Sequence, residues 1–175
     1  LQGLSPPLFL FRPFIMLQTL AVAAFAAVLL LCHWLWDWVQ ILDSANLAFH
    51  EAGHPLFGLL ASGLMVYGGT LMQLMMPAAA AWQLRQQGKV GGYHLCLLWL
   101  AENLLNVARY MADARRQELP LVGGGDHDWT FILSQWGLLR WDTTLALWLR
   151  LFAVGLMVWV LWLDWQQARI VRTSA

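Results

Sequence analysis

The sequence predicts an all-α membrane protein, a polytopic bundle of about four spanning helices with one short re-entrant or interfacial segment. Three observations support this fold class. Sixty per cent of the 175 residues are hydrophobic and 11% are charged, which lies outside the range of soluble domains. The mean hydropathy is +0.58. Several apolar stretches approach the roughly 20 residues that a helix needs to cross a bilayer.

The predicted spans follow one another in a single transmembrane helical domain, residues 1–175, with no internal repeat. Helix-capping residues at 43–46 introduce the second span. A loop with a glycine run at 123–125 separates the third span from the fourth. In chain order the spans cover about Phe14 to Trp36, Asn46 to Tyr67, Tyr93 to Ala112 and Thr144 to Leu163.

Residues 70–84 form a shorter apolar piece after the second span. Gly68 and Gly69 interrupt the helical pattern before it, and Pro77 lies inside it. A piece of about 15 residues is short for a full crossing, so a re-entrant or interfacial position is expected. The end of the third span would then reach the membrane face where the second span begins.

The second span contains an H-E-x-x-H motif, His50-Glu51-Ala52-Gly53-His54. On a helix, residues four apart share a face, so His50 and His54 can bind one zinc ion. Glu51 lies about 100° around the helix from His50, where it can take a proton from water beside the metal. Ionisable side chains cost free energy inside a membrane, so their presence in this span favours a functional role for the motif.

A catalytic zinc ion usually has three protein ligands and one open position. The third ligand is sought among Asp113, at the end of the third span, and His127 and Asp128, which follow the glycine run. His127 and Asp113 are favoured equally, and Asp128 is expected to orient an imidazole. The alternative is a solvated loop in which Asp126 or Asp128 caps the helix that starts near Trp129.

A stripe of polar residues runs along one face of the third span. Such residues face the bundle interior or a water-filled cavity. They could form a purely structural network in which Arg109 pairs with Asp113 or Glu102. They could instead support the metal site, with Arg109 orienting Asp113. The stripe consists of Glu102, Asn106, Arg109 and Asp113.

Two further histidines fall near span ends on opposite membrane sides, His33 in the first span and His94 in the third. This separation argues against a haem held between them. Each is expected to be a buried or interfacial histidine. Asn103 and Gln73 are weaker candidates for hydrogen bonding a substrate backbone.

The motif at the start of a spanning helix, with a distant aspartate at another helix end, resembles the site-2 protease family of intramembrane zinc metallopeptidases. The resemblance covers the motif and the general layout. It implies Zn²⁺ as the cofactor, held by His50, His54 and Asp113, with Glu51 as the base. It also implies a transmembrane protein substrate that is cut in or near the bilayer.

Three functions are therefore considered. The first is an intramembrane zinc metallopeptidase. The second is a non-catalytic, metal-retaining membrane subunit that packs against partner subunits of a larger complex. The third is a metal-dependent hydrolase or oxidase acting on a lipid. The net charge of zero gives no basic field for nucleic acid. We expect contact with membrane lipid, and location in a bacterial inner (cytoplasmic) membrane.

Overall fold

The computed structural model describes residues 12–122 and 125–173, and within these ranges its regular structure is all helical, without a strand. This confirms the predicted all-α class. The elements in chain order are α1 (Arg12–Trp36), α2 (Gln40–Leu60), the 3-10 turn η2 (Ser62–Leu64), α3 (Met65–Gln86), α4 (Val90–Ala112), α5 (Asp128–Gln135), the 3-10 turn η3 (Leu139–Trp141) and α6 (Asp142–Thr173).

Among the described residues, three helical stretches are long and apolar enough to cross a membrane, namely 13–36, 62–86 and 139–170. The first and last coincide with the predicted first and fourth spans. α4 forms the predicted third helix, but neither α2 nor α4 is among these three stretches. The structure therefore contains helices that could cross a membrane, but it does not confirm the predicted number of four.

The structure differs from the sequence-based expectation between residues 61 and 86. The chain turns at Ala61, whose backbone is extended, and α3 then runs without a break from Met65 to Gln86. Gly68 and Gly69 lie buried inside α3 and do not interrupt it. With 22 residues, α3 exceeds the length expected of a re-entrant piece. Each glycine weakens a helix by about 1 kcal/mol, and close packing against α2 offsets this loss.

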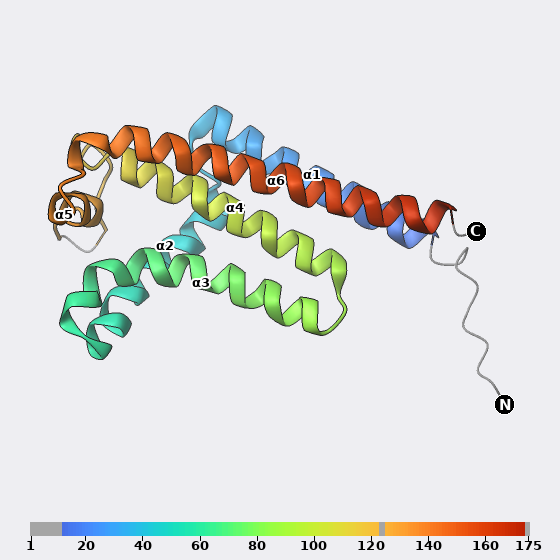
Figure 1. Cartoon of the computed structure of the whole chain (residues 1–175), viewed down its shortest axis with the longest axis horizontal. Coiled ribbons are helices and arrows are strands. Elements are labelled where there is room, and N and C mark those ends of the chain that lie inside the picture. Colours follow the sequence, from blue (N-terminus) through green and yellow to red (C-terminus); the bar gives the residue numbers. More distant parts are fainter. Residues whose placement is uncertain (1–11, 123–124, 174–175) are drawn as a thin grey trace.

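α4 lies between α3 and α6, and α1 runs alongside α6 (Figure 1). The main apolar core is formed where these helices meet, by side chains such as Leu29, Leu98, Ala101, Met157 and Val160. α5 and the end of α4 lie at the same end of the molecule as the turn between α2 and α3 (Figure 1). This arrangement brings the loop after α4 toward the H-E-x-x-H motif.

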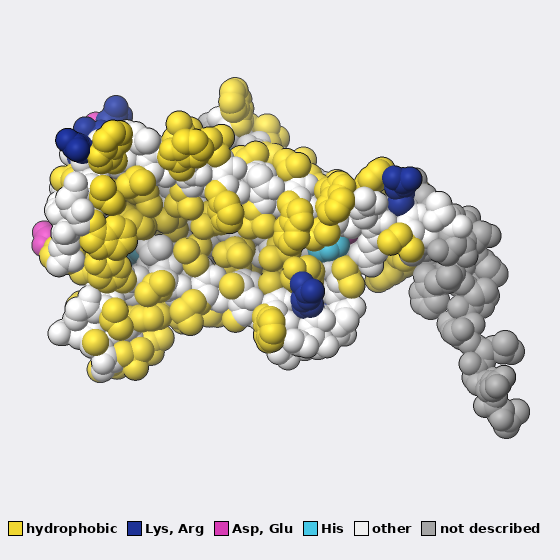
Figure 2. Space-filling view, in the orientation of Figure 1, with side chains coloured by type: hydrophobic (Ala, Val, Ile, Leu, Met, Phe, Trp, Pro, Cys, Tyr) yellow, Lys and Arg dark blue, Asp and Glu magenta, His cyan; other side chains and the backbone are white. Residues whose placement is uncertain are grey.

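The distribution of polar and apolar side chains is that of a protein in lipid. Hydrophobic side chains cover most of the face drawn in Figure 2. Trp148 on α6 is 66% exposed, and Leu17 on α1 is 65% exposed. In contrast, several charged and amide side chains are almost fully buried, among them Asp43, Asn46, Glu102 and Asn103. Polar groups inside and apolar groups outside suit an apolar solvent.

Candidate metal centre

The centre is built where α2 and α3 touch through two glycines. A Cβ atom on Gly53 would overlap the carbonyl oxygen of Gly68, and one on Gly68 would overlap the carbonyl oxygen of Gly53. Any larger residue would push the two backbones apart, since small residues are what allow helices to approach so closely. The glycine of the H-E-x-x-H motif thus fixes the distance between the two helices.

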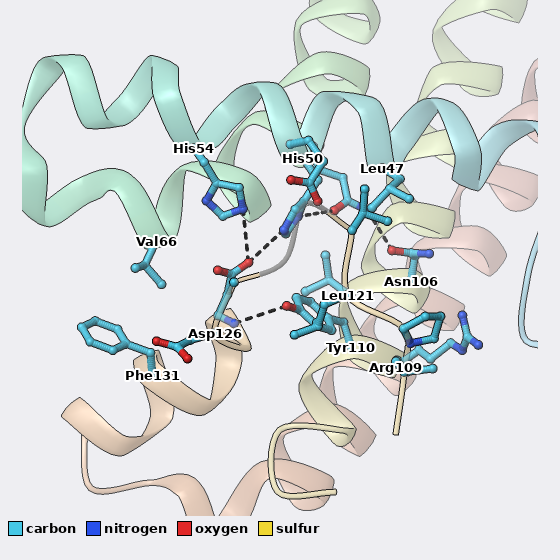
Figure 3. Close-up of a pocket in the computed structure, with 18 of the residues that line it drawn as sticks. Leu47, His50, His54, Val66, Asn106, Arg109, Tyr110, Leu121, Asp126 and Phe131 are labelled. Carbon is cyan, nitrogen blue, oxygen red and sulfur yellow. Dashed lines mark hydrogen bonds and ion pairs between the residues drawn. The ribbon is translucent and has the colours of Figure 1, made fainter. Parts of the chain in front are cut away.

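Gly69 makes room for the two imidazole rings. A Cβ atom there would lie 2.6 Å from Nε2 of His50 and 2.7 Å from Nε2 of His54. The two rings are 4.9 Å apart between centroids and meet edge to face. Figure 3 shows both turned into the same pocket from α2. The i, i+4 spacing therefore places them on one face, as the sequence predicts.

Fixed partners on α3 set the orientation of both rings. Nδ1 of His54 lies 2.9 Å from the carbonyl oxygen of Met65, which can only accept a hydrogen bond. Nδ1 of His50 lies 3.3 Å from Oε1 of Gln73. The Gln73 amide nitrogen donates to Asn106 (3.0 Å), which leaves its oxygen facing His50. In the neutral form of each ring, Nδ1 therefore carries the proton and Nε2 keeps a free lone pair.

Asp128, at the start of α5, faces both lone pairs. Its Oδ2 atom lies 2.9 Å from Nε2 of His50 and 3.4 Å from Nε2 of His54. Ligand atoms of the three residues all lie within 4.8 Å of one another. A positive charge between the carboxylate and the two rings, either a proton on Nε2 or a metal ion, would stabilise this arrangement. Donor atoms around a tetrahedral zinc ion at about 2.0–2.2 Å are about 3.3–3.6 Å apart. The 3.4 Å separation between Asp128 and His54 matches this range, whereas the 2.9 Å separation between Asp128 and His50 is that of a hydrogen bond and would widen around a metal.

The group opens into a cavity of about 750 Å³. Glu51 lines this cavity beside the two histidines, together with Tyr110 and Arg109 of α4. The backbone N–H of Asp128 donates to the Tyr110 hydroxyl (3.2 Å), so the hydroxyl proton is free for another acceptor. Apolar side chains from three parts of the chain complete the lining, including Val66, Leu121 and Phe131 (Figure 3).

Asp113 lies at the end of α4 and holds the following turn. Its two carboxylate oxygens accept hydrogen bonds from the backbone N–H groups of Glu118 and Leu119, each at 3.0 Å. A carboxylate engaged in this way shapes the loop that leads toward α5. Asp113 is not in the group with the two motif histidines. The structure therefore favours Asp128 as the third ligand over Asp113.

His127 is the N-cap of α5, and its Nδ1 atom accepts from the backbone N–H of Thr130 (3.4 Å). Its Nε2 atom must then carry the proton, and it lies 3.5 Å from Oδ2 of Asp113. Burial lowers the pKa of the His127 imidazole, which keeps the ring neutral. Because Nδ1 accepts from Thr130 and Nε2 carries the proton, the neutral His127 ring has no lone pair free to bind a metal. The N-cap of α5 is therefore His127, whereas the alternative interpretation of the sequence expected Asp126 or Asp128.

The polar stripe of α4 divides between two places. Asn106 holds Gln73, so it supports the orientation of His50. Glu102 lies deeper, where its Oε2 atom accepts from Asn46 (2.7 Å). Arg109 lines the cavity and stacks on the Trp38 ring, 5.6 Å from its centroid. Among the described residues, no ion pair joins Arg109 to Asp113 or Glu102.

Two residues have roles that the sequence does not predict. The sequence indicates Gln73 only as a contact for substrate, and it does not single out Tyr110. Gln73 is four residues after Gly69, so both lie on the face of α3 that meets α2. The amide of Gln73, four residues after Gly69 in an apolar helix, is the sequence signal that could have indicated a hydrogen-bond partner for a motif histidine.

Comparison of this chain with protein-family models, with curated proteins and with solved structures found no match.

Proposed function

We propose that this protein is an intramembrane zinc metallopeptidase, which hydrolyses peptide bonds in or near the bilayer. One observation carries the proposal: Nε2 atoms of His50 and His54 converge on Asp128 in a cavity that Glu51 also lines. Two imidazoles and a carboxylate form a common ligand set of hydrolytic zinc enzymes. In the proposed mechanism these three residues bind the metal ion, and Glu51 transfers the proton.

The chemistry divides between the metal and the side chains. When bound, zinc supplies Lewis acidity that polarises a carbonyl group and makes water more acidic. Glu51 accepts the proton of the attacking water and then donates a proton to the departing amine. Tyr110 has a free hydroxyl proton that can stabilise negative charge on the carbonyl oxygen of the substrate.

The cavity lining favours an apolar peptide as substrate. Met65, Val122 and Phe131 line it and remain 51%, 53% and 44% exposed. Of the helices that line the cavity, α3 is long and apolar enough to cross a membrane. A segment of a transmembrane protein can bury its own apolar side chains against these residues while its backbone reaches Glu51. We also propose that the protein is located in a bacterial inner membrane.

The test is proteolysis by the full chain reconstituted in lipid vesicles with Zn²⁺ and a single-span protein substrate. Glu51→Gln keeps the size of the side chain but removes the base, so cleavage should fall by about 10²–10⁴. Its zinc content should equal that of the wild type. Glu118→Gln serves as a matched control, because this exposed carboxylate lies outside the cavity.

Equal cleavage by the wild type and Glu51→Gln would contradict the mechanism. Absence of cleavage by either, with one zinc ion bound per His50–His54 site, would favour the non-catalytic subunit. Release of fatty acid from the vesicles, in place of peptide cleavage, would favour the lipid hydrolase. Product analysis by mass spectrometry separates these outcomes.

A further inference from the structure

We propose that the chain holds a second divalent-cation site, formed by His33, Asp43 and Glu102, in the interior where α1, α2 and α4 meet. The ligand atoms of these residues lie within 4.8 Å of one another. Asp43 and Glu102 are 0% exposed, and the His33 side chain is 12% exposed. This group shares no residue with the His50–His54–Asp128 centre.

Two atoms of the group point at one another without a hydrogen bond. Within the described part of the chain, Oε1 of Glu102 has no hydrogen-bond partner, and neither has Nε2 of His33. The two atoms are 3.4 Å apart. A fully buried carboxylate oxygen without a partner loses its hydration with no compensation. A cation between the two atoms would satisfy both.

The charges of the group also call for a cation. Two carboxylates are buried together, and within the described ranges no lysine or arginine forms an ion pair with either. Apart from His33, the side chains next to them are amides, which donate hydrogen bonds but bring no positive charge. A divalent ion would balance both carboxylates at once, as metals do for buried acidic groups.

The surrounding hydrogen bonds hold the carboxylates in place. Oδ1 of Asn46 accepts from Trp99 (2.8 Å) and Asn103 (3.2 Å). This turns the Asn46 amide nitrogen toward Oε2 of Glu102 (2.7 Å) and Oδ1 of Asp43 (3.3 Å). Such oriented ligands are typical of metal sites, in which the partners of the ligands fix their geometry.

The oxygens of Asp43 receive two further hydrogen bonds. Its Oδ2 atom accepts from the backbone N–H of Val39 (2.6 Å), and Oδ1 accepts from Asn106 (2.9 Å). Because Asn106 also accepts from Gln73, which contacts His50, a continuous chain of hydrogen bonds joins the two groups. A cation at Asp43 would therefore stiffen the support of the first centre.

The donor set indicates the kind of ion. One imidazole nitrogen with two carboxylates suits a first-row divalent ion such as Mn²⁺, Fe²⁺ or Zn²⁺. The ligands come from α1, α2 and α4. A bound ion would therefore join the first helix to the two helices that carry the candidate metal centre.

The test is metal stoichiometry of the purified full chain, loaded with Zn²⁺, desalted and analysed by mass spectrometry. The wild type should hold two equivalents. Glu102→Gln should lose one, because the amide can still accept from Asn46 but carries no charge. His33→Asn should also lose one. His94→Asn is the matched control, since His94 is a buried histidine paired with Asp164 (2.8 Å).

Loss by Glu102→Gln and His33→Asn, with both equivalents kept by His94→Asn, would support the second site. One equivalent in the wild type that both variants keep, and that His54→Ala loses, would overturn it and leave the proposed function standing. One equivalent that only Glu102→Gln and His33→Asn lose would support this site and refute the first. Near-ultraviolet circular dichroism verifies folding, and electron paramagnetic resonance of the wild type loaded with Mn²⁺ in place of zinc gives an independent count of bound ions.

Discussion

Oδ2 of Asp128 lies 2.9 Å from Nε2 of His50, although the two residues are 78 positions apart in the chain. The contact joins the start of α5 to the middle of α2. Nδ1 of His50 faces Oε1 of Gln73, so Nε2 is the nitrogen that is turned toward the carboxylate. A positive charge at this place, either a proton on Nε2 or a metal ion, would stabilise the contact of Asp128 with His50 and with His54.

The choice of third ligand can be tested with two aspartates. Asp128→Asn should lower zinc affinity at the first centre by at least about ten-fold, because an amide oxygen carries no charge. Asp113→Asn should leave that affinity within about two-fold, since Asp113 binds the backbone of residues 118 and 119. Competition with a fluorescent zinc chelator measures both. A larger loss with Asp113→Asn than with Asp128→Asn would contradict this assignment.

Gly69 should be intolerant of a methyl group. In Gly69→Ala the new Cβ would lie 2.6 Å from Nε2 of His50, so at least one ring must turn away. We expect loss of the zinc equivalent bound by the two motif histidines. Gly155→Ala on α6 is the control, because no atom lies within 4 Å of the position that its new methyl group would take. Stoichiometry equal to the control would show that Gly69 is not needed for the site.

Gly53 should matter for stability as well as for the site. A Cβ in Gly53→Ala would overlap the Gly68 carbonyl oxygen, and overpacking of this kind destabilises by about 1–3 kcal/mol. Thermal unfolding in detergent should show a lower midpoint. Gly63→Ala, at an exposed position with no neighbour within 4 Å, should leave the midpoint unchanged. A midpoint for Gly53→Ala at the wild-type value would refute the close helix contact.

Gln73 should act on zinc through His50. Gln73→Leu removes the acceptor that fixes the Nδ1 proton, and loss of such a partner typically weakens metal affinity by about 10–100-fold. Gln83→Leu, at an exposed position on the same helix, is the control. Zinc titration monitored by calorimetry measures both variants. Unchanged affinity in Gln73→Leu would show that His50 is oriented in another way.

Several features follow from the sequence alone. The apolar stretches 14–36 and 144–163 are long enough to form helices whatever they contact, and the structure has α1 and α6 there. The i, i+4 spacing of His50 and His54 places both rings on one face, because this depends only on helix geometry. The sequence also predicts that the end of α4 and the loop after it reach the motif.

The tertiary structure decided what depends on contacts between distant segments. Gly68 and Gly69 predict a break when judged by local propensity, but packing against Gly53 makes them part of a continuous α3. The sequence favours His127 and Asp113 equally as the third ligand and predicts that Asp128 orients an imidazole. Backbone N–H groups engage Asp113 and His127, so of these three only Asp128 keeps an oxygen for the two motif histidines. Hydrogen bonding across the fold thus holds Asp113 and His127 on other partners and leaves Asp128 facing the two motif histidines.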